Sequence, residues 1–231
     1  SGTAFEARAE LWNTYRLPVV RIPTNRPGQR ERLGVQVTSD ESAKWRAVAD
    51  EADRRRAVGR AVLIGTRSVR DSEAVSSVLN QRGIAHEVVN AVRHEQEAAV
   101  IERAGESGRV TVATNMAGRG TDIRLSDAAL RAGGLVVIAT ARHESGRVDR
   151  QLAGRAARQG EPGAVLEVVS RADDLLRRHG SWFTRLVGAA SVPWAMRLAQ
   201  FRAERRARRQ RRQLLLHDDW LDEHLGFARA E

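Results

Sequence analysis

The sequence predicts an α/β fold in which a parallel sheet is covered by helices on both faces and is followed by an all-helical tail. Three observations support this prediction. Short apolar runs alternate with segments of helical periodicity that are about ten to fifteen residues long. The run AVLIGT is apolar up to its last residue, as expected of a strand buried on both faces. After Ser170 the strand signal is lost, and the remaining chain is rich in Arg, Leu and Trp.

Residues 4–15 are expected to be helical, whereas the proline-rich segment 17–29 is expected to hold a strand and then an extended crossing segment. A helix then begins at the capping residues after Ser39. Further strands are expected at 61–66, 86–90, 109–114, 134–140 and 164–170, with further helices at 68–83, 94–105 and 146–159. Gly83 is expected to stop the first of these helices. The tail is expected to form two or three helices, one of them started or kinked by Pro193.

Composition limits the class of protein. The chain has 231 residues and 42% hydrophobic residues, which suits one large or two small globular domains. No apolar run approaches the roughly 18 residues of a membrane-spanning helix, so a soluble protein is expected. The first residues lack the pattern of a secretory signal and do not begin with Met, which suggests a start within a longer chain.

Residue usage also excludes two kinds of site. The net charge is +10, yet Lys44 is the only lysine, and the residues before it do not form the glycine-rich Walker A loop. The chain therefore carries no P-loop of its own. It has no cysteine, and its six histidines are scattered without ligand-like spacing, so no metal site is expected.

Three loops are expected to contribute to a ligand site, because ligands of α/β sheets bind where loops leave the carboxyl ends of strands. The first loop, at residues 65–73, enters a helix that Ser68 or Asp71 can cap. Such a helix start can meet an anion. The alternative is an ordinary capped helix, and the residues alone do not decide between the two.

The second loop contains the stretch AGRGTD at residues 117–122. Gly118 and Gly120 leave the backbone around Arg119 free to approach a ligand closely. Asp122 offers a carboxylate that can accept from a ribose hydroxyl or hold an arginine. The alternative interpretation is a turn with a local salt bridge.

The third loop, QLAGRAARQGEPG at residues 151–163, is the most informative. Gln151, Arg155 and Arg158 are spaced by four and three residues, so a helix would place all three on one face. Two adjacent guanidinium groups repel each other unless they share an anion, and a triphosphate would supply one. Arg155 and Arg158 would then stabilise the charge that builds up during phosphoryl transfer. A solvated basic face is the alternative.

These stretches together resemble a known family. In the same order, the chain resembles the second motor domain of the SecA preprotein translocase ATPase over about residues 19–180. The matching stretches are IPTNRP, VLIGTRSVRDSE, VTVATNMAGRGTDIRL, GGLVVIATARHESGRVDRQLAGRAARQGEPG and DDLLRRHG. The opening SGTA resembles the end of the motif that closes the first motor domain of that family.

The resemblance implies a helicase-like ATPase in which two RecA-like motor domains hold one nucleotide between them. Residues 1–20 would be the end of the first motor domain and a linker, residues 21–172 the second RecA-like motor domain, and residues 173–231 a helical scaffold-like tail. ATP would be bound mainly by the absent first domain, which also supplies the P-loop and the acidic residues that bind Mg²⁺. This chain alone is therefore expected to have negligible ATPase activity.

The resemblance also implies roles for individual residues. Arg155 and Arg158 stand at the arginine-finger positions of the family. The residues implied to contact the nucleotide are Gly118, Arg119, Gly120, Asp122, Gln151 and Gln159.

The resemblance further implies partners and a location. The partners would be a first motor domain on the same or a companion chain, a membrane translocation channel and preprotein substrates. The location would be cytoplasmic and peripheral on the inner face of the cell membrane. The run of seven arginines within residues 202–212 could also bind anionic lipids, or could be a solvated helix face.

The tail departs furthest from the family pattern, because only LLLHDDWLDEHLGF at residues 214–227 resembles the start of the second scaffold helix of the family. This departure favours a divergent or accessory member, or a fragment of one. Single positions depart as well. Ala157 replaces the glycine that is usual between the two finger arginines, and Ala153 and Gly146 stand where arginines are common. The loop between Leu125 and Gly133 is also shorter than usual.

Two other hypotheses compete with the translocation motor. The net charge and the pattern Q-x-x-G-R-x-x-R also suit half of a nucleic-acid helicase, but aromatics make up only 4% of the chain, so base-stacking surfaces and a nucleic-acid partner are not expected. A non-catalytic basic adaptor is the third hypothesis. It gives no reason to keep Asp122, Arg155 and Arg158.

Overall fold

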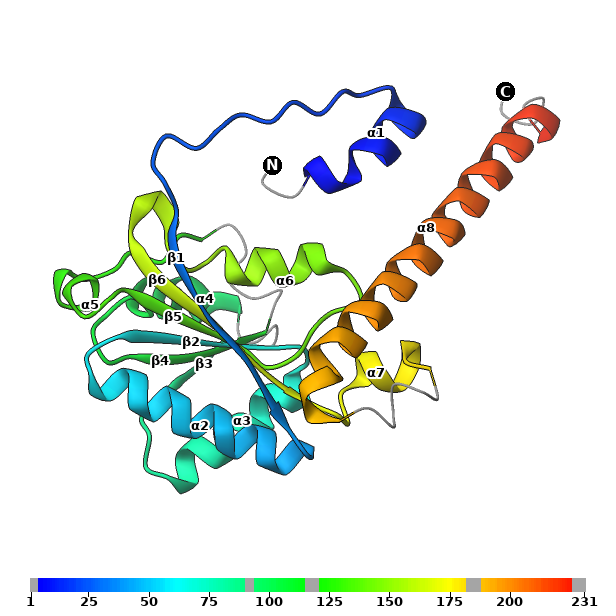
Figure 1. Cartoon of the computed structure of the whole chain (residues 1–231). Helices are drawn as coiled ribbons and strands as arrows, with labels where there is room; N and C mark the ends of the chain where they lie inside the picture. The colour runs from blue at the N-terminus through cyan, green and yellow to red at the C-terminus, as the bar shows by residue number, and fades with distance from the viewer. Residues whose placement is uncertain (1–3, 90–93, 115–120, 182–187, 226–231) are drawn as a thin grey trace.

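The computed structural model describes residues 4–89, 94–114, 121–181 and 188–225, which contain one six-stranded sheet with only parallel neighbours (Figure 1). The strand order is β1-β6-β5-β2-β4-β3. The strands are β1 (Gln29–Thr38), β2 (Ala61–Thr66), β3 (Glu87–Val89), β4 (Val110–Thr114), β5 (Leu135–Ala139) and β6 (Pro162–Ser170). The predicted α/β class is therefore confirmed.

Helices connect the strands and continue beyond the last of them. The described helices are η1 (Ala4–Ala7), α1 (Arg8–Tyr15), α2 (Glu41–Ala57), α3 (Val69–Gln81), α4 (His94–Arg103), α5 (Asp127–Arg131), α6 (Gly146–Ala153), η2 (Arg158–Gly160), α7 (Asp174–His179), η4 (Ala189–Ser191) and α8 (Val192–Leu225). Helix α5 lies in the segment between Leu125 and Gly133, for which the sequence predicts a loop. Its first turn is capped by Ser126, whose Oγ accepts a hydrogen bond from the Ala129 amide at 3.2 Å.

The central strand β2 explains why both faces of the sheet are covered. All of its residues are buried, and their side chains alternate between two hydrophobic clusters. Val62 and Ile64 pack with α2 and α3 on one face, whereas Ala61 and Leu63 pack with α4, α5 and α6 on the other. The arrangement is visible in Figure 1, where α2 and α3 lie below the sheet and α6 above it.

The predicted helix signals between β2 and β3 agree with the structure. Ser68 is the N-cap of α3, and its Oγ accepts a hydrogen bond from the Asp71 amide at 3.1 Å. The helix ends at Gln81, and Gly83 follows with a φ of 66°, a left-handed conformation that suits glycine. Ser68, rather than Asp71, is therefore the cap.

The N-terminal strand lies elsewhere than predicted. Residues 16–28 have no regular structure, and β1 begins only at Gln29, where the prediction placed the end of the crossing segment. Pro18, Pro23 and Pro27 lack the amide hydrogen that a strand needs. Strand β1 pairs only with β6 at the edge of the sheet, and its first four residues are exposed. Its charged sequence therefore lacks the apolar run that marks a buried strand.

The tail forms α7 and a long α8 that begins beside Pro193, as the sequence predicts. The first turns of α8 pack through Val192, Ala195, Met196 and Ala199 against α7 and β1. Beyond Ala203 the helix extends away from the sheet (Figure 1). Although α8 is 34 residues long, no helix in the described ranges has a stretch long and apolar enough to span a membrane.

Lys44 joins this tail to the rest of the fold. Its Nζ lies 2.8 Å from Oδ1 of Asp173, and both side chains are buried. Burial raises the pKa of Asp173, although the Lys44 ammonium acts in the opposite direction. The only lysine of the chain thus makes a structural ion pair between α2 and the start of α7.

Candidate functional site

The third predicted loop, which carries Arg155 and Arg158, lies at the amino edge of the sheet, whereas the sequence predicts it at the carboxyl edge. Residues 154–161 follow α6 and lead into β6. In a parallel sheet each helix returns from the carboxyl edge to the amino edge, so this loop enters β6 at the amino edge. The register agrees, because Gly163 of β6 pairs with Leu135, the first residue of β5. The expected position at a carboxyl end was therefore wrong for this loop.

The single helical face expected for Gln151, Arg155 and Arg158 was also wrong. Helix α6 ends at Ala153, so Gln151 lies exposed in its last turn and the two arginines follow in the loop. Within the loop, Ala157 (φ 57°) and Gln159 (φ 55°) adopt left-handed backbone conformations that a helix cannot contain. The helical spacing in the sequence thus continues beyond Ala153, where the helix itself ends.

Asp122 brings two of the predicted residues together. Its Oδ1 lies 2.7 Å from Nη1 of Arg158, and its Oδ2 accepts a hydrogen bond from Nε2 of Gln159 at 3.2 Å. The sequence analysis gives Asp122 two possible roles, accepting from a ribose hydroxyl or holding an arginine. The structure shows the second role.

The pair between Asp122 and Arg158 is accessible from solvent. The side chain of Asp122 is 43% exposed and that of Arg158 is 39% exposed. The Nε of Arg158 also donates to the Gly154 carbonyl at 3.2 Å. These bonds use Nε and Nη1, and within the described residues the Nη2 donors of Arg158 make no further hydrogen bond.

Of the remaining predicted site residues, one lies within the described ranges and three lie outside them. Arg155 is half-buried, and its amide donates to the Leu152 carbonyl at 3.0 Å. Gly118, Arg119 and Gly120 lie outside the described residues.

Close packing fixes the shape of this loop. A Cβ atom added to Gly163 would lie 2.6 Å from the amide nitrogen of Ala157 and 3.1 Å from the Leu135 carbonyl oxygen. Only glycine therefore allows the loop to approach the start of β6 so closely. The backbone between Arg155 and Arg158 rests directly on the sheet.

Arg30 is a contributor that the sequence analysis missed. It stands near the start of β1, and its Nη1 donates to the carbonyl of Ala153, the last residue of α6, at 2.9 Å. The bond satisfies one of the carbonyl groups that remain unpaired at a helix C-terminus. Arg30 and the loop are far apart in sequence, and only the parallel pairing of β1 with β6 brings them together.

The charge of Asp122 affects the pKa of a second carboxyl group, that of Glu161. Burial raises the pKa of Glu161, and the Asp122 carboxylate raises it further. Two carboxyl groups, those of Asp122 and Glu161, thus accompany the arginines at this place. An anionic ligand at this place would have to be held by the arginines.

The first predicted loop remains an ordinary capped helix in its local contacts. Arg67 directly follows β2. Its Nη2 lies 3.8 Å from Oε1 of Glu144, and its Nη1 lies 3.7 Å from Oδ2 of Asp174. His179 also approaches Glu144, with Nε2 3.2 Å from Oε1. These contacts join the carboxyl edge of β2 to the segment before α6 and to α7. In the parts of the chain that the structure describes, no group of three or more His, Asp or Glu side chains could hold a metal ion.

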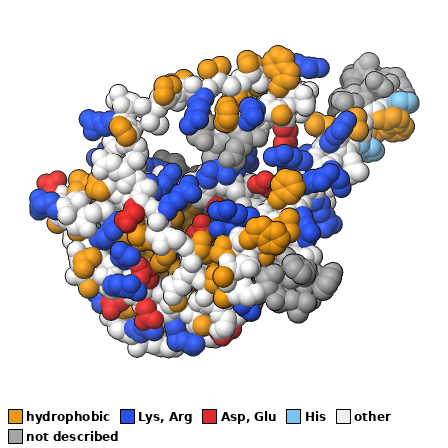
Figure 2. Space-filling model, viewed as in Figure 1, with side chains coloured by type: hydrophobic (Ala, Val, Ile, Leu, Met, Phe, Trp, Pro, Cys, Tyr) orange, Lys and Arg blue, Asp and Glu red, His pale blue; other side chains and the backbone are white. Residues whose placement is uncertain are grey.

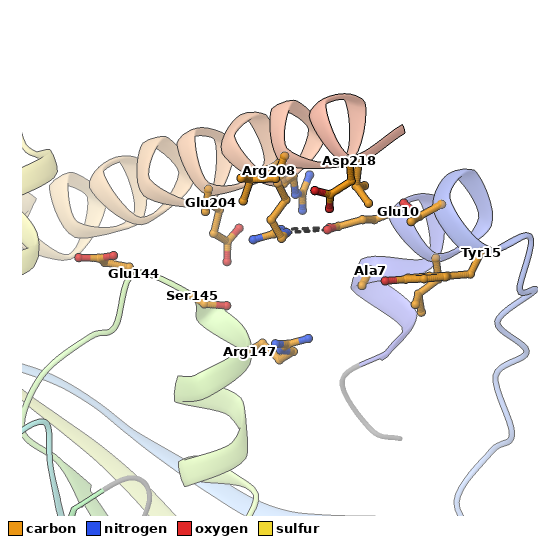
Figure 3. Close-up of a pocket in the computed structure, with 15 residues that line it drawn as sticks. Ala7, Glu10, Tyr15, Glu144, Ser145, Arg147, Glu204, Arg208 and Asp218 are labelled. Carbon is orange, nitrogen blue, oxygen red and sulfur yellow. Dashed lines mark hydrogen bonds and ion pairs between the residues drawn. The ribbon is translucent and has the colours of Figure 1, made fainter. Parts of the chain in front are cut away.

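One cavity lies away from the loop of residues 154–161 that carries Arg155 and Arg158, which we call the arginine loop. A cavity of about 630 Å³ lies between α1, the start of α6 and α8 (Figure 3). Its lining includes Glu10, Arg147, Glu204 and Arg211, and the ion pair between Glu10 and Arg211, with Nε and Oε1 2.6 Å apart, spans it. The cavity lies at the N-terminal end of α6, whereas Arg155 and Arg158 follow the C-terminal end.

Exposed apolar side chains lie on two segments, the N-terminal segment and α8, and α8 is also strongly basic. Figure 2 shows basic side chains along α8 and apolar side chains along the N-terminal segment that crosses the top of the view. The arginines of residues 202–212 are all exposed. The exposed apolar residues of the two segments include Leu17, Val20, Ile22, Leu214, Leu216 and Trp220.

Comparison with known proteins identifies the family. The family model described as "SecA P-loop domain" matches residues 27–131 and 126–189. "Protein translocase subunit SecA 2" of Magnetococcus marinus is 45% identical over 98% of this chain and 36% of its own length. The protein of the same name from Nitrosospira multiformis is 47% identical over 99% of this chain and 36% of its own length. "Protein translocase subunit SecA" of Bacteroides fragilis is 51% identical over 78% of this chain and 16% of its own length.

The chain thus spans about a third or less of the length of these relatives. Among solved structures, E. coli DEAD-box protein SrmB bound to regulator of ribonuclease activity A shows the same fold, with a TM-score of 0.53 and 21% identity over 63% of this chain and 81% of that one. The yeast DEAD-box splicing factor Prp28 has a TM-score of 0.54 and 14% identity over 82% of this chain and 43% of that one. These likenesses add the RecA-like helicase fold, and the family match and relatives show that the chain belongs to the SecA family.

Proposed function

We propose that this chain provides the second motor domain of a SecA-type ATP-driven protein translocase. Residues 21–172 close on ATP that is held mainly by a first motor domain, and Arg155 and Arg158 complete the site. The observation that carries the proposal is the arrangement at Asp122, which holds Arg158 and Gln159 on an accessible part of the surface.

The donors at this loop suit a phosphate group. The Asp122 carboxylate fixes one nitrogen of the Arg158 guanidinium, while the Nη2 donors remain for an anion. A planar guanidinium matches the spacing of phosphate oxygens and keeps its charge at any physiological pH. Arg158 can therefore bind a phosphate oxygen while its other side stays on Asp122. Held in place before the reaction, it stabilises negative charge without reorganisation.

Nucleotide and metal are shared unequally between the two domains in this proposal. ATP supplies the phosphoryl group that is transferred to water. This chain has no P-loop lysine, because Lys44 is buried in an ion pair with Asp173. The carboxylate of Asp122 is already bonded to Arg158 and Gln159, so Mg²⁺ is assigned to the first domain. This chain contributes cations to the site and closes it from solvent.

The remaining parts of the chain follow the same division. Residues 1–20 are the end of the first motor domain and a linker, and residues 173–231 form a scaffold-like helical tail. The names of the relatives support a role in protein translocation. We further propose preproteins as substrates, a membrane channel as partner and a peripheral position on the inner face of the cell membrane. Two of the relatives named SecA 2 match 98% and 99% of the chain, which favours an accessory type.

A comparison of ATP turnover by this chain and by the parent protein tests the proposal. The purified 231 residues are expected to show negligible turnover and weak nucleotide affinity, because half of the site is missing. A protein that carries both motor halves is expected to hydrolyse ATP. Robust turnover by the 231 residues alone would refute the division of the site, and an inactive parent protein would favour the basic adaptor.

A further inference from the structure

Helix α8 supplies a cap to helix α6. Ser145 occupies the N-cap position of α6 but makes no capping hydrogen bond with its side chain. Instead, Oε1 of Glu204 on α8 accepts a hydrogen bond from the Gly146 amide at 2.9 Å. Figure 3 shows Glu204 extending from α8 toward the start of α6 at Ser145. The carboxylate satisfies one of the amides that a helix leaves unpaired and suits the positive end of the helix dipole.

Gln200 makes a second connection at the same place. Its Nε2 donates to the His143 carbonyl at 2.8 Å and to Oδ2 of Asp149 at 2.6 Å. Asp149, in the first turn of α6, also accepts from the His143 amide at 2.9 Å and lies 2.7 Å from the His143 Nδ1. One amide group of α8 thus bonds to both sides of the bend by which the chain enters α6.

These contacts join a firmly anchored part of α8 to α6. Gln200 and Glu204 are one helical turn apart and therefore face the same way. They follow directly after Met196 and Ala199, which are fully buried between α7 and β1. The Pro193 carbonyl also accepts a hydrogen bond from Nη1 of Arg142 at 3.3 Å. The start of α6 is thus held by a part of α8 that is itself packed on the sheet.

Helix α6 can transmit this constraint to the arginine loop. The helix has eight residues, so its two ends are only about 12 Å apart. At its far end, Leu152 packs so closely on β2 that a Cβ atom added to Gly65 would lie 2.4 Å from Cδ2 of Leu152. Arg155 and Arg158 follow directly after this contact. A shift at the first turn of α6 therefore moves the loop that carries both arginines.

We propose that Gln200 and Glu204 are positioning residues for Arg155 and Arg158. They fix the start of α6 and thereby the orientation of the arginine loop, so nucleotide turnover depends on two side chains of α8 that do not touch the nucleotide. The inference rests on the proposed function, because it assigns these residues to the same site.

Substitutions that keep or remove single hydrogen bonds test the inference. In the parent protein with both motor halves, Glu204→Ala removes the cap, whereas Glu204→Gln retains an oxygen that accepts from the Gly146 amide. Gln200→Glu keeps the size of the side chain but faces the Asp149 carboxylate with a second carboxylate. We expect Glu204→Ala and Gln200→Glu to lower kcat by about ten- to a hundredfold with little change in the KM for ATP, because misplaced catalytic groups mainly weaken transition-state binding. Glu204→Gln should restore most of the kcat.

Two further measurements separate positioning from general destabilisation. Val75→Ala removes buried methyl groups from α3 on the opposite face of the sheet, so it should lower the melting temperature without lowering kcat. If Glu204 acts only through the two arginines, adding Glu204→Ala to a variant that already carries Arg155→Ala and Arg158→Ala should lower kcat no further. A further loss in this triple variant, or kcat values of Glu204→Ala and Gln200→Glu close to wild type, would overturn the inference.

The same experiments distinguish this inference from the proposed function. If Arg158→Ala abolishes turnover while the α8 variants remain active, only the positioning role fails. If Arg155→Ala and Arg158→Ala both leave kcat unchanged, the arginine-finger role fails and the positioning role fails with it.

Discussion

The Asp122→Asn substitution separates the stability of the arginine loop from its activity. The ion pair between Asp122 and Arg158 is short, at 2.7 Å, but its side chains are 43% and 39% exposed. Exposed pairs contribute about 0–1 kcal/mol because water and salt screen them. The hydrogen bond from Gln159 can persist to the asparagine oxygen. We therefore expect the free energy of unfolding to fall by less than about 1 kcal/mol, which corresponds to about 2–4 °C at most in the melting temperature.

Thermal unfolding of the chain, followed by circular dichroism, measures this effect. A double-mutant cycle with Arg158→Ala isolates the pair, and its coupling energy should also stay below about 1 kcal/mol and decrease with added salt. In the parent protein, Asp122→Asn should lower the rate of ATP turnover clearly although it changes the melting temperature little, because Arg158 loses the group that orients it. A coupling energy above about 3 kcal/mol, typical of a broken buried pair, would refute the view that the pair is accessible to a nucleotide.

Three further predictions concern the loop and the N-terminal helix. Ala157→Gly should raise the free energy of unfolding by about 0–1.5 kcal/mol in chemical denaturation, because a left-handed alanine costs about 1–2 kcal/mol and the extra freedom of glycine costs about 0.5–1 kcal/mol; a loss of stability would contradict it. Gly163→Ala should lower the free energy of unfolding by about 1–3 kcal/mol and slow ATP turnover, because its Cβ would meet backbone atoms; an unchanged melting temperature would show that the loop moves away freely. A hydrogen bond from Arg211 lowers the pKa of Glu10 below its ordinary 4.5. The stabilisation is present above that value and lost as the pH falls through the folded pKa, so the difference in melting temperature between wild type and Arg211→Gln should be constant at neutral pH and vanish in acid. A pH-independent difference would mean that this ion pair is not its cause.

The fold was largely predictable because its buried strands carry a strong local signal. Strand β2 was predicted at its observed residues, since a strand that is buried on both faces must be apolar throughout. Strand β1 was missed because it lies at an edge and begins with exposed charged residues. The preceding segment is more apolar, but its prolines cannot pair.

The contacts among the candidate site residues could not be predicted from the sequence. The spacing of Gln151, Arg155 and Arg158 is helical, yet the backbone turns left-handed at Ala157, a conformation that the sequence does not announce with a glycine. The partner of Arg158 is Asp122, which is 36 positions away in sequence. The contact of Arg30 with Ala153 spans 123 positions. Such contacts depend on the order of strands in the sheet, and no local pattern encodes that order.

Arg155 and Arg158 are proposed to complete a nucleotide site. The most direct measurement is ATP turnover by the parent protein that carries both motor halves, with Arg155→Ala and Arg158→Ala, in the presence of anionic vesicles. Arg171→Ala is the matched control, because this exposed arginine follows β6 at the opposite edge of the sheet. We expect each loop variant to lose about a hundredfold or more in kcat, the scale of a removed arginine finger, while the control stays near wild type. Turnover that is unchanged by both loop substitutions would contradict the claim and would leave the two arginines as a basic surface.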